Sequence, residues 1–162
     1  MTQNDKQPLA WMKGLPFADE SYAFEWVRTL GSAYFGGADL IECLETAGRI
    51  AEGDGESWYR EWLETAERVR GLAEGSLASG HAVSAREAYL RASNYYRTAE
   101  FYIHADPKDE RHLAAARRSR DCFVEALKLF PYRAEPVRIP YEGTTLPGYF
   151  LTSPWPKGML RC

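Results

Sequence analysis

The chain has few of the residues and patterns on which several classes of protein depend. Its 162 residues include three cysteines, Cys43, Cys122 and Cys162, which are widely spaced and form no CxxC pair. Such cysteines fit reduced thiols better than a disulfide framework or a zinc site. No apolar run approaches the length of a membrane span, and the first ten residues lack the basic start and apolar centre of a secretion signal. We therefore expect a cytoplasmic protein with no membrane partner.

An excess of charge of one sign is also missing. Lys and Arg number 20, Asp and Glu number 23, and the net charge of −3 is spread along the chain. This composition argues against a general nucleic-acid surface, so we expect no nucleic-acid partner. Hydrophobic residues make up 45% and aromatic residues 14% of the chain, which is enough for a buried core in a domain of this size.

What the sequence does contain is a series of apolar residues at helical spacing. They predict five helices, at about residues 19–31, 39–52, 56–79, 84–103 and 109–130. Asp19 and Asp39 are suited to cap the first two helices, and Ser84 with Glu87 forms a capping-box pattern for the fourth. In the second helix the spacing predicts a buried stripe of Leu40, Ile41, Leu44, Ala47 and Ile50. In the fifth it predicts a stripe of Leu113, Ala116, Phe123, Leu127 and Phe130.

A period-two pattern replaces the helical one from Glu135 to Thr152. It predicts two antiparallel strands joined by a turn at Gly143, Thr144 and Thr145. A lone hairpin is marginally stable and leaves two unpaired edges. We therefore expect the front part of a larger protein, with unusually exposed side chains at Val137, Ile139, Tyr141, Leu146 and Phe150. Such exposure also allows a homo-oligomer.

The predicted fold is thus mainly α, a five-helix domain followed by an antiparallel β-hairpin. We divide the chain into an N-terminal arm (1–16), a helical domain (17–134), the hairpin (135–152) and an irregular tail (153–162).

Groups that perform hydrolysis are hard to find. A serine nucleophile of the GxSxG type is absent from the sequence, since Ser32 and Ser76 each follow a glycine but lack the second one. Cys43 and Cys122 fall within predicted helices, where buried thiols are the usual outcome. We therefore predict no catalytic residue in this chain.

Metal and anion sites have equally weak signals. His81, His104 and His112 have no i,i+4 pairing of the zinc-binding kind, and His104 lies at a helix end, where capping is the simpler role. The basic residues of the fifth helix fit a solvated face, or pairing with acidic residues of the third helix, better than an anion site. We predict no metal and no cofactor.

The strongest candidate for contact with a ligand is Asn94-Tyr95-Tyr96 in the fourth helix. Neighbouring side chains on a helix point about 100° apart, so both tyrosines cannot face the same way. Core packing explains one of them, and the other can face a pocket or another domain. We therefore take Asn94, Tyr95 and Tyr96 as candidate residues near a substrate.

Four segments together resemble one protein family. They are residues 33–37 (AYFGG), 53–62 (GDGESWYREW), 84–100 (SAREAYLRASNYYRTAE) and 139–151 (IPYEGTTLPGYFL), in this order. They are similar to α/β-hydrolases with a helical N-terminal domain, a group that includes 2,6-dihydroxypseudooxynicotine hydrolase and fungal enzymes that shorten a polyketide pigment precursor. The resemblance extends from about residue 17 to 152. It implies a lid-like helical domain that packs over a hydrolase core, with 139–151 as the first two strands of the hydrolase sheet.

The resemblance also implies an activity for the parent protein. Members are similar to serine hydrolases with a Ser/Asp/His triad that cleave esters or carbon–carbon bonds next to a carbonyl. All three triad positions would lie beyond residue 162, so we expect a chain truncated before the triad, inactive alone, whose partner is the missing hydrolase core.

Two alternatives of another class remain open. Phe123, Ala126 and Pro131 fit the F-x2-A-x4-P ending of a tetratricopeptide unit, although no second copy lies about 34 residues away. A scaffold protein that keeps only the helical domain is the other alternative, but it would have no need of the two strands.

Overall fold

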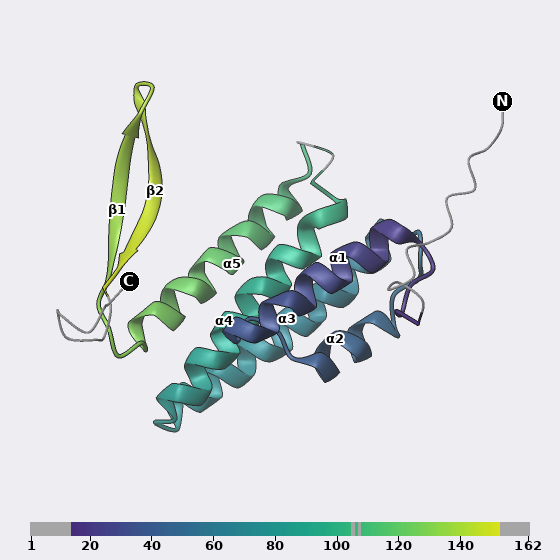
Figure 1. Cartoon of the computed structure of the whole chain (residues 1–162), viewed down its shortest axis with the longest axis horizontal. Helices are drawn as coiled ribbons and strands as arrows, with labels where there is room; N and C mark the ends of the chain where they lie inside the picture. Colours follow the sequence, from purple (N-terminus) through teal and green to yellow (C-terminus); the bar gives the residue numbers. More distant parts are fainter. Residues whose placement is uncertain (1–13, 105, 107, 153–162) are drawn as a thin grey trace, which may run out of the picture.

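The computed structural model describes residues 14–104, 106 and 108–152. Within them the chain forms five α-helices, two short 3₁₀ turns and one antiparallel hairpin (Figure 1). The elements are α1 (Glu20–Leu30), η2 (Gly31–Phe35), α2 (Leu40–Ala47), α3 (Gly55–Ala78), α4 (Ala82–Ala99), η3 (Glu100–Tyr102), α5 (Glu110–Lys128), β1 (Ala134–Tyr141) and β2 (Thr144–Leu151). The predicted fold class is confirmed. The predicted tail and all but the last three residues of the predicted arm lie outside the described residues.

Aspartate caps set the start of four helices. The Asp19 carboxylate accepts from the amides of Ser21 and Tyr22, and Asp39, Asp54 and Asp109 cap α2, α3 and α5 in the same way. Such a cap satisfies amides that have no partner inside the helix. The predicted caps at Asp19 and Asp39 are therefore confirmed.

Helix α4 begins differently, and its predicted capping box is wrong. The helix starts at Ala82, so Ser84 and Glu87 already lie inside it, and no side chain caps it. Its start is set by the tight connection from α3, in which Gly80 has a φ of +79° and the His81 carbonyl accepts from the amide of Ala85. This connection reverses the chain and lays α4 against α3 (Figure 1).

The core lies mainly between α3 and α4, and α5 packs against the other side of α4. Trp58, Trp62, Tyr95 and Tyr96 are fully buried. The small residues between them let the helices approach closely, as the sequence predicts: Ala66, Ala73, Ala88, Ala92 and Ala99. The Trp58 indole N–H donates to the Thr98 carbonyl at 2.8 Å, so this large side chain is buried without losing its hydrogen bond.

Helix α2 turns a different face to the core from the one predicted. Its buried residues are Cys43, Thr46 and Ala47, whereas Leu40, Ile41 and Leu44 are exposed. Contacts with α1 and α3 fix this orientation. The Trp26 indole of α1 donates to the Cys43 carbonyl, and the hydroxyls of Thr46 and Thr65 are 2.7 Å apart. The predicted stripe is therefore wrong at its first three positions and correct at Ala47 and Ile50.

The stripe of α5 is shifted as well. Ala115, Cys122, Ala126 and Leu127 are the buried residues of this helix, while Leu113 and Ala116 are exposed. The predicted stripe is therefore wrong at Leu113 and Ala116 and correct at Leu127, and Phe123 and Phe130 are half-buried. The Ser119 hydroxyl donates to the Ser93 carbonyl of α4 at 2.7 Å, and this contact helps to fix which side of α5 meets α4.

The hairpin has a two-residue turn at Glu142 and Gly143, with φ of +41° and +79°. Positive φ at both positions matches the mirror-image turn that suits the twist of two strands, and Thr144 and Thr145 belong to β2. The predicted Gly-Thr-Thr turn is therefore wrong.

The predicted exposure of the hairpin is confirmed for Ile139, Tyr141, Leu146 and Phe150, which are 47–61% exposed, whereas Val137 is half-buried. The Tyr149 ring packs against Phe123 of α5, with centroids 5.5 Å apart.

Candidate functional site

The three residues predicted to lie near a substrate are together on α4, and Asn94 acts as a tether. Its side-chain amide donates to the carbonyls of Thr29, at 3.1 Å, and Gly37, at 2.9 Å. The first carbonyl lies near the end of α1 and the second follows η2. Asn94 therefore fixes both ends of the segment that carries AYFGG.

Tyr95 holds the start of α2. Its hydroxyl donates to Oε2 of Glu42 at 2.8 Å and accepts from the amide of Asp39 at 2.8 Å. Nε of Arg91 donates to the same Glu42 oxygen at 3.1 Å. Burial raises the pKa of Tyr95 far above its ordinary value, so the hydroxyl stays protonated and available for both bonds.

Tyr96 points about 100° away from Tyr95 around α4 and is also fully buried, so neither tyrosine ring is exposed at the surface of the described chain. Burial, and next the Glu67 carboxylate, raise its pKa above the ordinary value. Proximity of Asn94, Tyr95 and Tyr96 to a substrate stays a prediction. Their described contacts show what they do in this chain, where Asn94 and Tyr95 anchor residues 29–42.

The anchored segment presents a surface that the sequence analysis missed. Tyr34 and Phe35 of η2 are 89% and 79% exposed, and their rings meet edge to face with centroids 5.0 Å apart. Leu40, Ile41 and Leu44 of α2 are 50%, 59% and 42% exposed. We call these five residues the aromatic–aliphatic face. Two patterns in the sequence could have indicated this surface. The AYFGG segment contributes only to the family resemblance, and the apolar stripe of α2 was predicted to lie in the core.

Two glycines shape the turn that carries this face. Gly36 has a φ of +76°, a conformation that favours glycine. A Cβ at Gly37 would lie 3.0 Å from Cβ of Ser32, so a larger residue would push the turn open. The geometry of Tyr34 and Phe35 therefore depends on these glycines and on Asn94.

Phe35 of the aromatic–aliphatic face also lines a groove of about 320 Å³. Its walls come from the η2–α2 connection, from α4 and from the residue after α5: Phe35, Gly36, Ala38, Asp39, Arg86, Glu87, Leu90, Arg91 and Phe130. The Arg86 guanidinium lies over the Phe130 ring, 5.0 Å from its centroid. The groove thus joins the aromatic–aliphatic face to the point where the chain leaves α5 for β1.

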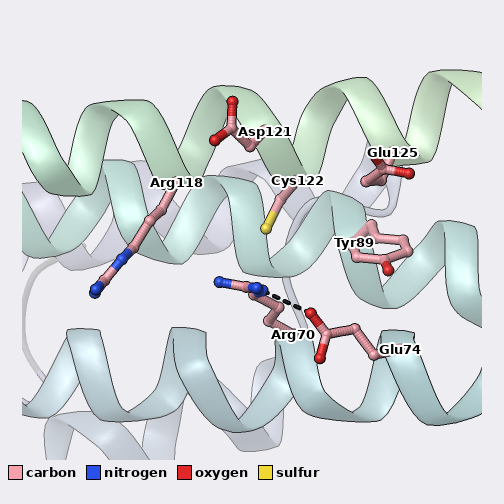
Figure 2. A pocket seen from close by; sticks show the side chains of 7 residues that line it. All are labelled: Arg70, Glu74, Tyr89, Arg118, Asp121, Cys122 and Glu125. Carbon is pink, nitrogen blue, oxygen red and sulfur yellow. Dashed lines mark hydrogen bonds and ion pairs between the residues drawn. The ribbon is translucent and has the colours of Figure 1, made fainter.

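A second pocket, of about 280 Å³, lies between α3, α4 and α5 (Figure 2). The pocket is lined by side chains of both charges, and Nε of Arg70 pairs with Oε1 of Glu74 at 2.8 Å. Its other lining residues are Tyr89, Arg118, Asp121, Cys122 and Glu125. Burial raises the pKa of the Cys122 thiol to about 11, so it is protonated at neutral pH. A protonated thiol is a poor nucleophile, and this pocket gives no support for covalent catalysis.

The other candidate groups have structural roles in the described chain. The predicted burial of Cys43 and Cys122 is confirmed, and burial raises the pKa of Cys43 to about 12. His104 does not cap a helix through its side chain in any described contact; its Nδ1 lies 3.4 Å from Oε2 of Glu100. The predicted pairing of α5 with α3 is confirmed by Arg111 with Glu56 and by Arg118 with Glu67.

Metal and membrane sites were sought in the same part of the chain. Residues 14–104, 106 and 108–152 bring together no group of three or more His, Cys, Asp or Glu side chains suited to a metal ion. None of the helices in this region combines the length and apolar character needed to cross a bilayer.

Known proteins with similar sequences are hydrolases. The 20-hydroxy-prefusarin hydrolase of Gibberella moniliformis is 44% identical over 133 residues, which cover 82% of this chain and 32% of that protein. A hydrolase of Aspergillus aculeatus is 42% identical, over 78% of this chain and 30% of its own length. An α/β-hydrolase of Aspergillus fumigatus is 40% identical, over 85% and 32%. The chain therefore spans about a third of the length of these relatives. No model of a known protein family matches it.

The fold has a counterpart among solved structures. The crystal structure of 2,6-dihydroxy-pseudo-oxynicotine hydrolase superimposes with a TM-score of 0.57 at 24% identity, over 74% of this chain and 32% of that one. The coverage of about a third recurs in sequence and in structure, which fits one domain of a longer hydrolase. The chain belongs to this family of α/β-hydrolases, and its coverage of about a third of each relative fits an N-terminal domain.

Proposed function

We propose that this chain is the N-terminal helical portion of a serine hydrolase that cleaves an ester, or a carbon–carbon bond next to a carbonyl. The observation that carries this proposal is the match to about a third of several hydrolases. The remaining two thirds of such an enzyme, which we call the hydrolase core, would supply the nucleophile, the base and the acid. The division into a helical domain at 17–134 and a first core hairpin at 135–152 belongs to the same proposal.

The chemistry of the described residues supports the assignment of the catalytic groups to the hydrolase core. Acyl transfer needs an activated nucleophile and donors that stabilise an oxyanion. The two described thiols, Cys43 and Cys122, are buried, and burial raises the pKa of each so that both are protonated at neutral pH. The described part of the chain would therefore contribute by covering the core and excluding water.

The role proposed for Asn94, Tyr95 and Tyr96 follows from their contacts. Asn94 and Tyr95 would act on a substrate through the segment that they anchor, residues 29–42, which carries exposed aromatic side chains. They are therefore proposed as positioning residues. The match to hydrolases along 82% of the chain favours this family over a tetratricopeptide module or a scaffold.

The test compares the chain alone with a chimera. In the chimera, residues 1–151 replace the matching third of the 20-hydroxy-prefusarin hydrolase. Both proteins are assayed on an activated ester and on 20-hydroxy-prefusarin. We expect turnover by the chimera and none by the chain alone. Turnover by the 162-residue chain that disappears with Cys43→Ala or Cys122→Ala would contradict the proposal, because the catalytic group would then lie in this chain.

A further inference from the structure

We propose that the aromatic–aliphatic face and the adjoining groove are the surface on which the hydrolase core docks. This inference rests on the proposed function and adds the contact surface and its partner. The partner is the hydrolase core, in which the hairpin continues into an α/β-hydrolase sheet with its helices. This core would carry an apolar patch that meets the five exposed side chains.

Five large apolar side chains are exposed within eleven residues, 34–44. Monomeric proteins rarely expose apolar side chains in such a concentration unless the patch is an interaction site. A rotation of α2 cannot bury them, because the Trp26 bond to Cys43 and the Thr46–Thr65 contact fix the opposite face of that helix. These residues therefore stay exposed until another surface covers them.

The path of the chain after α5 identifies the hydrolase core as the partner that occupies the groove. Phe35 and Phe130 both line the groove, and only three residues separate Phe130 from the start of β1 at Ala134. Four residue steps span at most about 14 Å, so the sheet that continues β1 and β2 begins next to the groove. The contact of Tyr149 with Phe123 holds the hairpin against α5, which precedes it in the chain.

The hydrolase core and a second copy of the chain differ in the effective concentration at which they meet the aromatic–aliphatic face. A core joined to the bundle by a few residues meets the face at an effective concentration of about millimolar, whereas a second copy meets it at its own concentration. The groove also combines charged lining residues, Arg86, Glu87 and Arg91, with the apolar side chains of Leu90 and Phe130. An apolar centre with a polar rim is the usual anatomy of a protein interface.

The test measures the accessibility of single cysteines to a maleimide. Tyr34→Cys places a thiol in the aromatic–aliphatic face. Leu113→Cys is the matched control, because Leu113 is 47% exposed near the start of α5, outside the groove and ten residues before the Phe123 contact with the hairpin. In the 162-residue chain both variants carry Cys162→Ser, and the native Cys43 and Cys122 are buried. Each variant is made in the 162-residue chain and in the chimera described above.

In the chain alone, we expect Tyr34→Cys and Leu113→Cys to react at similar rates. In the chimera, we expect the Tyr34→Cys rate to fall by about tenfold or more, because labelling then requires a local opening, while Leu113→Cys is unchanged. Unchanged labelling of Tyr34→Cys in a chimera that hydrolyses its substrate would overturn the docking surface and leave the proposed function intact. Protection at Tyr34→Cys in an inactive chimera would support the docking surface and count against the proposed function.

Two further measurements keep the inference falsifiable. If the chimera does not fold, the same two cysteines are placed at the aligned positions of the intact 20-hydroxy-prefusarin hydrolase, where the same difference is expected and equal rates overturn the inference. Labelling of the chain alone is also repeated across a hundredfold range of concentration. A Tyr34→Cys rate that falls as concentration rises, with dimers in light scattering, would assign the face to a second copy and overturn the core as its occupant.

Discussion

Replacing Tyr95 with phenylalanine removes one oxygen atom on which the start of α2 depends. The Tyr95 hydroxyl accepts from the Asp39 amide and donates to the Glu42 carboxylate, both at 2.8 Å. Phenylalanine fills the same space, so the packing of α4 against α3 is kept. The substitution therefore isolates the two hydrogen bonds that join α4 to α2.

The structure sets the size of the effect. A hydrogen bond to a charged group is worth about 1.5–3 kcal/mol, and an unsatisfied amide costs about 1–3 kcal/mol. Glu42 keeps its bond to Arg91, and the Asp39 amide is only part-buried, so both contributions fall in the lower half of their ranges. We expect Tyr95→Phe to lower the free energy of unfolding by about 2–4 kcal/mol.

Urea denaturation measures this free energy, and hydrogen exchange of residues 39–47 shows where the loss acts. We expect faster exchange at the first turn of α2 and unchanged exchange in α5. Tyr34→Phe is the matched control, because it removes a hydroxyl from a side chain that is 89% exposed, and its effect should stay within about 0.5 kcal/mol.

An unfolding free energy within about 0.5 kcal/mol of the unsubstituted chain, with unchanged exchange in α2, would refute the reasoning. In that case the Tyr95 hydroxyl would not hold the start of α2. Of the two anchoring residues on α4, Asn94 alone would then hold the segment that carries the aromatic–aliphatic face.

Three further predictions concern the core, the hairpin and the thiols. Ala92→Leu or Ala99→Leu should lower the unfolding free energy by about 1–3 kcal/mol in urea denaturation, because both alanines are fully buried; no loss would mean that the core has room there. Ending the chain at Phe130 should reduce self-association and binding of a hydrophobic dye, measured by light scattering and fluorescence; equal values for both lengths would mean that the hairpin is covered in solution. Burial raises the pKa of Cys122 from 9.0 to about 11, so its contribution to stability is fully present below pH 9 and is lost as the pH rises towards 11. Cys122→Ala should flatten this part of the profile of unfolding free energy against pH, and an unaltered profile would contradict the assignment.

Local sequence determined the number of helices in the described chain and most of their starts. Asp19 and Asp39 cap helices through contacts two or three residues away, so no tertiary partner is needed to recognise them. The pattern of α3 and α4 was equally clear, because Trp58, Trp62 and the alanines facing them belong to long helices that are buried along one side. The period of two in residues 135–152 likewise predicted the hairpin, although the turn needed positive φ at Glu142 and was placed one residue late.

Only part of the candidate site could be predicted from the sequence. Asn94 and Tyr95 stood out as polar and aromatic residues on a tightly packed helix, but their partners are 53–65 residues away in the chain. No local pattern indicates that an amide at position 94 will meet the carbonyls of Thr29 and Gly37. Tyr34 and Phe35 were missed for the same reason, since an aromatic pair beside two glycines fits a buried turn as well as an exposed one.

The sequence by itself therefore determined the secondary structure, the helical domain with its hairpin, and the resemblance to one hydrolase family. Only the tertiary structure decided which face of α2 is buried, where α4 begins, and which side of α5 meets its neighbour. Helical spacing specifies that an apolar stripe exists, whereas its orientation depends on distant partners such as Trp26 and Thr65. Those contacts bury Cys43 and leave Leu40, Ile41 and Leu44 outside, which is why the aromatic–aliphatic face is a property of the fold.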